Sequence, residues 1–238
     1  MARSRAPRLP GIIIKAIALL LVFSVNGILI WRMCSSQDPA SMRILTVNAA
    51  THKAYTEKGE ALCLRYQEQA SITRTERNYG YFSITQCVFI PEAEQVQIVL
   101  RYNNSTLTHL KEDYGLPEIP DRSLDLFDVT LLRTTDPDPQ NPEDNYNADA
   151  LLKTRFFPTV EDTKSDTSAL YNYRRYVFDG VSVEDLTLGV FVDIYYVGDV
   201  RYEERAYGTL CLYDHEMEWQ PYTLTKEDLR ALAEYPHP

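Results

Sequence analysis

Apolar and polar residues alternate along several stretches of this chain, and this alternation constrains the fold more than any other feature. In residues 95–102, apolar side chains occupy the even positions, and Gln95, Gln97 and Arg101 occupy odd ones, with Val99 as the exception. Five apolar residues share the even positions of 188–196: Leu188, Val190, Val192, Ile194 and Tyr196. A period of two places successive side chains on opposite faces of a strand, so each stretch is predicted to be a half-buried β-strand.

Similar patterns predict about nine strands in all. The others cover residues 44–48, 61–67, 81–90, 127–131, 151–157, 171–178 and 208–213. Helix signals are few: a short turn at 107–113, and Thr225 with Asp228 at the spacing of a capping box before a C-terminal helix. Many strands and few helices predict a mainly β fold, namely an antiparallel, Ig-like β-sandwich with a short C-terminal helix. A closed barrel is the alternative.

An apolar run at residues 11–31 contains a single charged residue, Lys15. As a helix, a run of this length extends about 30 Å, which is the thickness of the hydrocarbon core of a bilayer. A cleaved signal peptide is the alternative, but its apolar region is usually only about 7–15 residues long. The length therefore favours an uncleaved transmembrane helix at 11–31.

Positive charge predicts the orientation of this helix. Arg3, Arg5 and Arg8 precede the run, and only Arg32 follows it directly. Because positive charge is retained on the cytoplasmic side, the basic N-terminus 1–10 is expected to be cytoplasmic. This predicts a single-pass cell-membrane protein whose first partner is the lipid bilayer, through residues 11–31. A tether at 32–42 then leads to an extracytoplasmic domain at 43–238.

The remainder of the chain is strongly acidic. Residues 1–32 hold five of the 24 Lys and Arg and none of the 34 Asp and Glu, which leaves residues 33–238 with a formal charge of −15. Such a surface repels nucleic acid and anionic headgroups, so a nucleic-acid partner is excluded. The charge is typical of a soluble domain that is held near a membrane without lying on it.

The four cysteines, Cys34, Cys63, Cys87 and Cys211, do not have metal-ligand spacing, and no cofactor is expected. Three of them lie in apolar, strand-like runs, where a cysteine behaves as a small hydrophobic residue. Outside the cell, a disulfide between Cys63 and Cys87 is the alternative.

An acidic, proline-containing stretch at 136–149 is predicted to be a solvated loop. A calcium site is the alternative, because Asp136, Asp138 and Asp144 offer oxygen ligands. The spacing differs from that of an EF-hand loop, and no glycine supplies its sharp turn, so the solvated loop is favoured.

Tyrosine is frequent, with 17 residues against 8 Phe and 2 Trp, and it clusters at 171–176. Tyrosine suits the half-wet face of a sheet, and it is also enriched at interaction surfaces. The functional hypothesis is a binding face made of five residues: Tyr171, Tyr173, Arg174, Arg175 and Tyr176. A purely structural strand is the alternative.

An enzyme is a further alternative, although no serine hydrolase, metalloprotease or phosphate-loop motif occurs. An N-terminal anchor before a β-rich domain resembles the layout of the sortase family of cysteine transpeptidases. The segment Gly208-Thr209-Leu210-Cys211 is similar to their Thr-Leu-x-Thr-Cys motif, but it lacks one residue and the second threonine. The resemblance implies Cys211 as nucleophile with a histidine such as His109, yet an apolar strand disfavours a thiolate.

Three runs resemble uncharacterised single-pass membrane-anchored proteins of Gram-positive, clostridia-like bacteria. They are residues 96–106 (VQIVLRYNNST), 127–131 (FDVTL) and 187–196 (TLGVFVDIYY). The likeness covers most of residues 60–230 and contains no catalytic motif. It implies a bacterial envelope location and implies no activity.

The sequence therefore predicts a membrane-anchored, extracytoplasmic interaction or assembly module of the cell envelope, with a protein or cell-wall partner and no assigned catalytic residue. A sortase-like transpeptidase using Cys211 is one alternative, and an extracytoplasmic ligand sensor or carrier subunit is another. A cleft with converging polar groups would favour an enzyme, whereas a flat tyrosine-rich face would favour a binding module.

Overall fold

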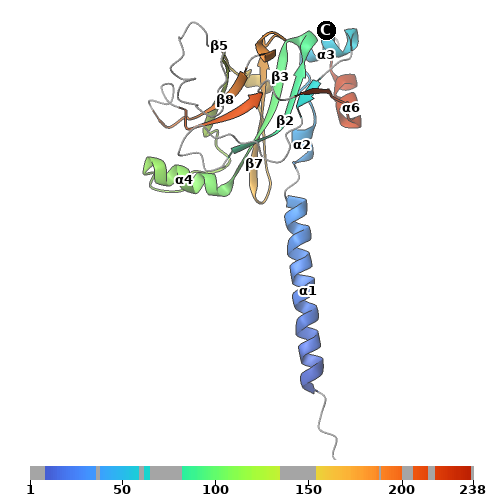
Figure 1. The fold of residues 1–238 in the computed structure, drawn as a ribbon, viewed down its shortest axis with the longest axis vertical. Coiled ribbons are helices and arrows are strands. Elements are labelled where there is room, and N and C mark those ends of the chain that lie inside the picture. Colours follow the sequence, from blue (N-terminus) through green and yellow to red (C-terminus); the bar gives the residue numbers. More distant parts are fainter. Residues whose placement is uncertain are drawn as a thin grey trace, which may run out of the picture. The chain divides into compact units, whose positions relative to one another are not determined.

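The computed structural model describes residues 9–35, 38–58, 62–64, 82–134, 154–187, 189–199, 206–213 and 218–236. The chain divides into two compact units, residues 1–37 and residues 38–238. Helix α1 (Leu9–Ser35) forms the first unit, and all the described strands belong to the second (Figure 1). The second compact unit begins at Asp38.

Helix α1 exposes large apolar side chains around its circumference. Twelve of them between Ile13 and Trp31 have exposed fractions of 52–68%. They include the five consecutive residues from Leu19 to Phe23, so no single side of the helix is covered. Among the helices that the structure describes, none is both long enough and apolar enough to cross a membrane. The transmembrane helix predicted at 11–31 is therefore not confirmed.

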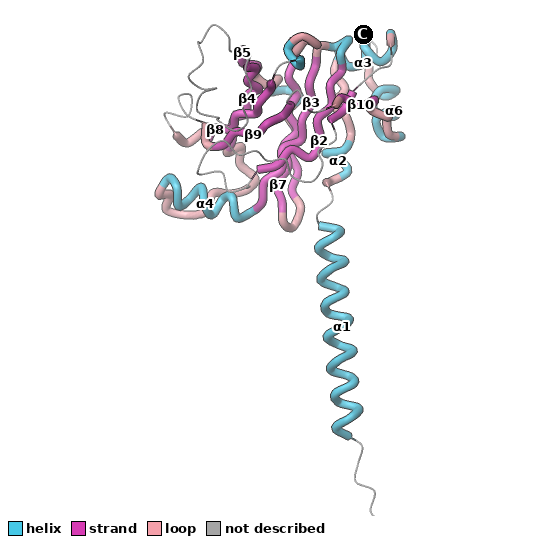
Figure 2. Tube along the Cα trace, viewed as in Figure 1, coloured by secondary structure: helices cyan, strands magenta, loops and turns pink. Residues whose placement is uncertain are grey.

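The second unit is a mixed α/β fold with two antiparallel sheets (Figure 2). One sheet has six strands in the order β10-β1-β2-β3-β7-β6, and the other has four in the order β5-β4-β8-β9. Neither sheet closes into a barrel among the described strands. The helices and short 3-10 turns of this unit make the fold class mixed rather than mainly β.

The strands have the following bounds: β1 (Leu62–Leu64), β2 (Phe82–Ile90), β3 (Gln95–Asn103), β4 (Phe127–Thr134), β5 (Thr154–Phe156), β6 (Lys164–Thr167), β7 (Tyr171–Asp179), β8 (Gly189–Tyr196), β9 (Gly208–Tyr213) and β10 (Trp219–Pro221). The helices and 3-10 turns of the second unit are α2 (Ala40–Arg43), α3 (Ala49–Glu57), η1 (Pro91–Ala93), α4 (Asn104–Tyr114), η3 (Val160–Asp162), η4 (Asp185–Thr187) and α6 (Lys226–Glu234). The sequence pattern missed the short elements α2, α3, β6 and β10.

Alternation correctly predicts the long strands, but the strand predicted at 44–48 is wrong. This segment has the apolar pattern of a strand, yet side chains rather than a neighbouring strand bind its backbone. The Leu45 N–H donates to Asp228 Oδ1 at 2.7 Å, and the Thr46 N–H donates to Gln97 Oε1 at 2.9 Å. A local pattern cannot identify such partners, because they lie 51 and 183 residues away.

Capping residues set the starts of two helices. Asn103 precedes α4, and its side-chain oxygen accepts the Thr106 N–H at 2.9 Å. At α6, the Asp228 N–H donates to Thr225 Oγ1, and Asp228 Oδ2 accepts the Thr225 N–H. This reciprocal pair is a capping box, so the C-terminal helix predicted from that motif is confirmed.

One apolar core draws side chains from both sheets. The even residues of β3 and the odd residues of β4 lie in it, together with even residues of β8. Four aromatic rings meet near its centre: Phe82, Tyr102, Phe127 and Tyr207. Because one face of each sheet supplies these residues, the two sheets exclude water from the same interior.

The opposite face of the six-stranded sheet is covered by the two ends of the second unit. Helices α3 and α6 lie side by side (Figure 1), and the His52 and Tyr235 rings stack at 5.1 Å. Beneath the 38–49 segment, Arg175 is buried and donates to the Met42 carbonyl, to Gln86 Oε1 at 2.6 Å and to Gln97 Oε1 at 3.2 Å. Burial lowers the pKa of Arg175 to about 10.

Candidate functional site

The five residues proposed as a binding face lie on strand β7 but do not share one exposed surface. Tyr173, Arg174, Arg175 and Tyr176 are at most 4% exposed, and Tyr171 is half-buried. The pleat of the strand divides them: Tyr176 joins the core between the sheets, while Tyr173 packs against Met42 on the other face. Because period two separates neighbours, the five residues do not form one exposed face, although Arg174 and Tyr176 lie together on the pocket described below.

The other predicted site residues are not brought together either. Asp136, Asp138 and Asp144 lie outside the described residues, and within the described part no cluster of three metal-ligating side chains occurs. Strand pairing sets Cys63 opposite Val88 and Leu64 opposite Cys87. A disulfide across two antiparallel strands joins directly opposed residues. Cys63 and Cys87 are offset by one position, so this pairing does not favour the suggested disulfide.

Cys211 and His109 are in unlike surroundings. Cys211 lies on β9 at 1% exposure, whereas His109 is a partly exposed residue of α4 whose Nδ1 is 3.5 Å from Glu112 Oε2. A catalytic cysteine needs a thiolate that substrate can reach. The burial of Cys211 gives the transpeptidase alternative no support.

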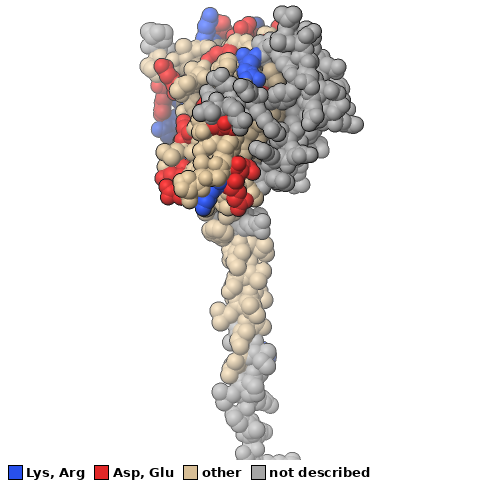
Figure 3. Space-filling view, turned by 90° about the vertical axis from the view of Figure 1, so that its left-hand side faces the viewer, with Lys and Arg blue, Asp and Glu red and all other residues tan. Residues whose placement is uncertain are grey.

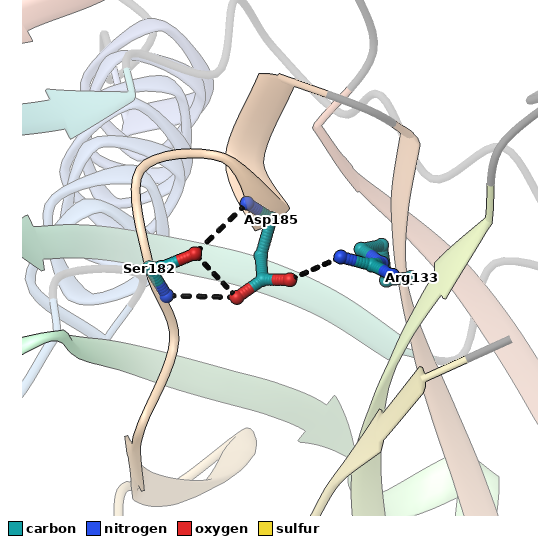
Figure 4. A network of polar contacts seen from close by, with 3 residues as sticks. All are labelled: Arg133, Ser182 and Asp185. Atoms are coloured by element: carbon teal, nitrogen blue, oxygen red, sulfur yellow. Dashed lines mark hydrogen bonds and ion pairs between the residues drawn. The ribbon is translucent and has the colours of Figure 1, made fainter.

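A polar network after β7 is well ordered but has a structural explanation (Figure 4). Asp185 accepts the N–H and the hydroxyl of Ser182 at 2.9 and 2.8 Å, and its other oxygen binds Arg133 Nη1 at 2.5 Å. Burial alone would raise the pKa of Asp185, but the Ser182 hydrogen bonds and the Arg133 ion pair hold it below its ordinary value. The network joins the turn at η4 to strand β4.

Among the described residues, side chains of both sheets line a pocket of about 700 Å³. Strands β4 and β8 contribute from the four-stranded sheet, and β6 and β7 contribute from the six-stranded sheet. The chain between β5 and β6 forms its rim. This volume lies within the range of small-molecule and peptide pockets, which is about 300–1,000 Å³.

The rim exists because the chain changes sheets between β5 and β6. After β5, the Thr159 N–H donates to the Val177 carbonyl at 2.8 Å, and Thr159 Oγ1 donates to Asp179 Oδ2 at 2.5 Å. These contacts fasten the rim to β7. Two apolar rim residues remain uncovered, since Phe157 is 69% exposed and Val160 is 82% exposed. Such exposed apolar groups beside a cavity are typical of a binding mouth.

Two arginines of the pocket already have carboxylate partners. Arg174 Nε donates to Asp125 Oδ1 at 3.0 Å and Arg174 Nη2 donates to the Leu124 carbonyl at 2.8 Å. Arg155 Nη2 lies 3.8 Å from Asp193 Oδ2. Because both positive charges are balanced, the pocket does not present an arginine awaiting an anion.

Burial shifts the pKa values of three further polar side chains of the pocket. Burial raises the pKa of Tyr195 to about 12, with a further contribution from Asp193, so the phenol stays protonated. Burial and the nearby charge of Asp125 raise the pKa of Asp128. Burial and the charge of Arg175 lower the pKa of Lys164, which is paired with Arg175 across the strands. The pocket is therefore amphipathic and close to neutral.

The lining contains carboxylate, lysine and tyrosine side chains. None of the described lining residues is a histidine or a cysteine, and Asp125 is occupied by Arg174. On the face in Figure 3, Asp and Glu cover more of the coloured surface of the second unit than Lys and Arg do. A neutral, partly apolar ligand meets the least electrostatic opposition there.

Comparison with known proteins identifies no relative. No protein-family model, no curated protein and no solved structure matches the chain. The candidate site therefore rests on the geometry of the pocket and not on similarity to another protein.

The walls of this pocket come from distant segments, from Asp125 to Tyr195, so no local pattern predicts it; of the predicted binding residues, Arg174 and Tyr176 line it. One local signal was available, the pair Phe157-Pro158 at the end of a predicted strand. A proline cannot donate to a strand ladder, so it marks a point where the chain leaves the sheet.

Proposed function

We propose that this chain is an interaction module of the cell envelope that binds a partner in the pocket between its two sheets. The observation that carries this proposal is the cavity of about 700 Å³, with its amphipathic lining and the exposed rim residues Phe157 and Val160. Capture of an apolar group by the rim would remove its area from water, which is favourable by about 25 cal/mol per Å². The absence of a nucleophile–base pair among the described lining residues favours binding over catalysis.

We also propose that the second unit is a β-sandwich of the Ig-like kind. The shared core, to which both sheets contribute one face, supports a sandwich. The antiparallel pairing of every neighbouring strand is in keeping with it.

The proposed location is the cell membrane, with the N-terminus cytoplasmic and the second unit extracytoplasmic, as in a bacterial envelope protein. The exposed apolar side chains of α1 support contact with lipid, because the exposure of so much apolar surface to water is unfavourable. The arginines at positions 3, 5 and 8 support the orientation.

Replacing Leu21 and Val25 together by aspartate is expected to move the protein from the membrane fraction to the soluble fraction. Each aspartate costs roughly 2.5–3.5 kcal/mol when placed in the middle of a bilayer. Fractionation in alkaline carbonate, followed by immunoblotting, measures the change. Leu229→Asp is the matched control, because Leu229 is 54% exposed on α6 and outside α1. Identical fractionation of all three proteins would refute lipid contact through α1.

Photo-crosslinking tests the pocket. A p-benzoylphenylalanine at position 157 is expected to form adducts with the partner in producing cells, because Phe157 lies on the rim. The same group at Val183, which is 52% exposed and does not line the pocket, is the control and should form at most a tenth as much.

A pocket-filling substitution sharpens this experiment. Ser165→Trp should remove the position-157 adduct, whereas Thr167→Trp, two residues along β6 and outside the lining, should leave it. Thermal unfolding of both variants controls for folding. Equal adducts at positions 157 and 183, or adducts insensitive to Ser165→Trp, would contradict the proposal.

A further inference from the structure

Strand β4 is longer than the strand that covers its outer edge. β5 pairs only with Leu131, Leu132 and Arg133, although β4 begins at Phe127. Among the described strands, none pairs with residues 127–130 on the side away from β8. All four of these residues line the pocket. The pocket therefore contains a stretch of the β4 edge that no described strand pairs with.

The hydrogen-bond pattern shows which backbone groups face this edge. The Val197 N–H donates to the Leu126 carbonyl at 3.2 Å. This hydrogen bond lies next to the opposed pair Phe127 and Tyr196, one position beyond it. In an antiparallel ladder, a pair flanked in this way is the non-hydrogen-bonded kind. Phe127 and Val129 therefore direct their N–H and C=O groups away from β8, toward the pocket.

One of these carbonyls already has a partner, whereas no described residue bonds to the Val129 groups on the pocket side. The Phe127 carbonyl accepts the Tyr176 hydroxyl at 3.2 Å. No hydrogen bond to the Val129 N–H or C=O comes from any described residue on the pocket side. Val129 is 1% exposed, and buried backbone groups are nearly always paired, so an N–H and a C=O without a partner among the described residues would gain from one.

The sequence explains why β5 stops before reaching Val129. If the pairing of Phe156 with Leu131 continued, Phe157 would oppose Thr130 and Pro158 would oppose Val129. Pro158 has no N–H to give to the ladder. The chain instead crosses to β7 through Thr159, so β5 does not pair with the β4 edge beside Val129.

We infer that the pocket binds an extended peptide segment of a partner protein, which adds as a strand to β4 beside Val129. This inference rests on the proposed function and names the class of its ligand. Strand addition draws its affinity from main-chain hydrogen bonds and its selectivity from alternate side chains. The residue opposite Val129 points into the apolar space beside Tyr176, and its two neighbours point toward Asp128, Thr130 and Arg155.

The balanced charges of the pocket favour such a peptide over an ionic ligand. Both arginines hold carboxylates, so a free anion would have to displace Asp125 or Asp193. A peptide backbone is neutral and offers one N–H and one C=O per residue. Successive side chains of the peptide would point to opposite sides. An apolar residue between two polar ones therefore suits a pocket that is apolar on the side of Tyr176 and polar on the side of Asp128 and Arg155.

Hydrogen exchange of the full chain in detergent micelles tests the inference. The probe is acetyl-Thr-Thr-Val-Thr-Thr-amide, and the matched control is the same peptide N-methylated at its three central residues, which blocks both edges. The probe should slow exchange of the Val129 amide at least about tenfold, as a new hydrogen bond requires. The Leu131 amide, which already faces β5, should be unchanged. The N-methylated peptide should alter neither amide.

Three results would overturn strand addition: no protection of Val129 at millimolar probe, equal protection by both peptides, or protection spread equally to Leu131. Ser165→Trp should abolish the effect and Thr167→Trp should retain it. The two proposals fail separately. If crosslinking from position 157 depends on the pocket while Val129 stays unprotected, the pocket binds its partner by another mode. If crosslinking also fails, the pocket itself is not the interaction site.

Discussion

Replacing Phe82 with alanine is expected to lower the free energy of unfolding of the second unit by about 3–5 kcal/mol. Phe82 is 1% exposed and stands where the two sheets share their core. Its ring lies 5.0 Å from that of Phe127, 5.8 Å from that of Tyr102 and 6.1 Å from that of Tyr207. Alanine would remove the ring from all three and leave a cavity, and the rigid strands around it allow only partial collapse.

Urea unfolding of the full chain in detergent micelles, followed by circular dichroism, measures this loss. Phe157→Ala is the control with the same chemical change, because Phe157 is 69% exposed and should change stability by less than about 0.5 kcal/mol. A Phe82→Ala protein as stable as Phe157→Ala would show that the central rings do not join the sheets as described.

Replacing Gln97 with leucine is expected to cost about 3 kcal/mol, because its buried amide holds the N-terminal segment on the sheet. Gln97 Oε1 accepts the Thr46 N–H at 2.9 Å and Arg175 Nη1 at 3.2 Å. Gln97 Nε2 donates to the Thr46 carbonyl at 2.8 Å and to Gln95 Oε1 at 2.8 Å. Leucine has a similar volume but leaves these buried groups unpaired.

The loss should be visible both globally and locally. Urea unfolding gives the free energy, and hydrogen exchange should show the Thr46 amide losing its protection. Arg101→Leu is the matched control on the same strand and face; Arg101 is only half-buried, and the change removes a hydrogen bond to Ser83 at 3.2 Å and a contact over the Tyr171 ring at 4.6 Å. We expect it to cost at most about 1 kcal/mol. Equal costs for the two variants would mean that the amide network does not hold the segment.

Local patterns predicted those features that depend on neighbours in sequence. The alternation at 95–102 and 188–196 correctly placed β3 and β8, because one face of each strand lies in the core. Thr225 and Asp228 correctly marked the start of α6, since a capping box is made within four residues.

The same patterns failed where distant partners decided the outcome. Residues 44–48 have a strand pattern, but the side chains of Gln97 and Asp228 bind their backbone. The tyrosines of β7 suggested a surface, but the 38–49 segment covers one side of that strand and the four-stranded sheet covers the other. Both errors arise because exposure depends on what packs over a strand, which its own residues do not encode.

The sequence by itself determined the alternation of the strands, the caps of the helices and the position of Pro158, because each acts over a few residues. Only the tertiary structure decided that residues of both sheets enclose a pocket and that Val129 lies on it where no described strand pairs with β4. Strand pairing brings together segments far apart in the chain, and the register between them determines which N–H and C=O groups remain open. In this protein, Pro158 ends β5 through a local effect. The packing of the two sheets then places the adjoining edge of β4 in the candidate binding pocket.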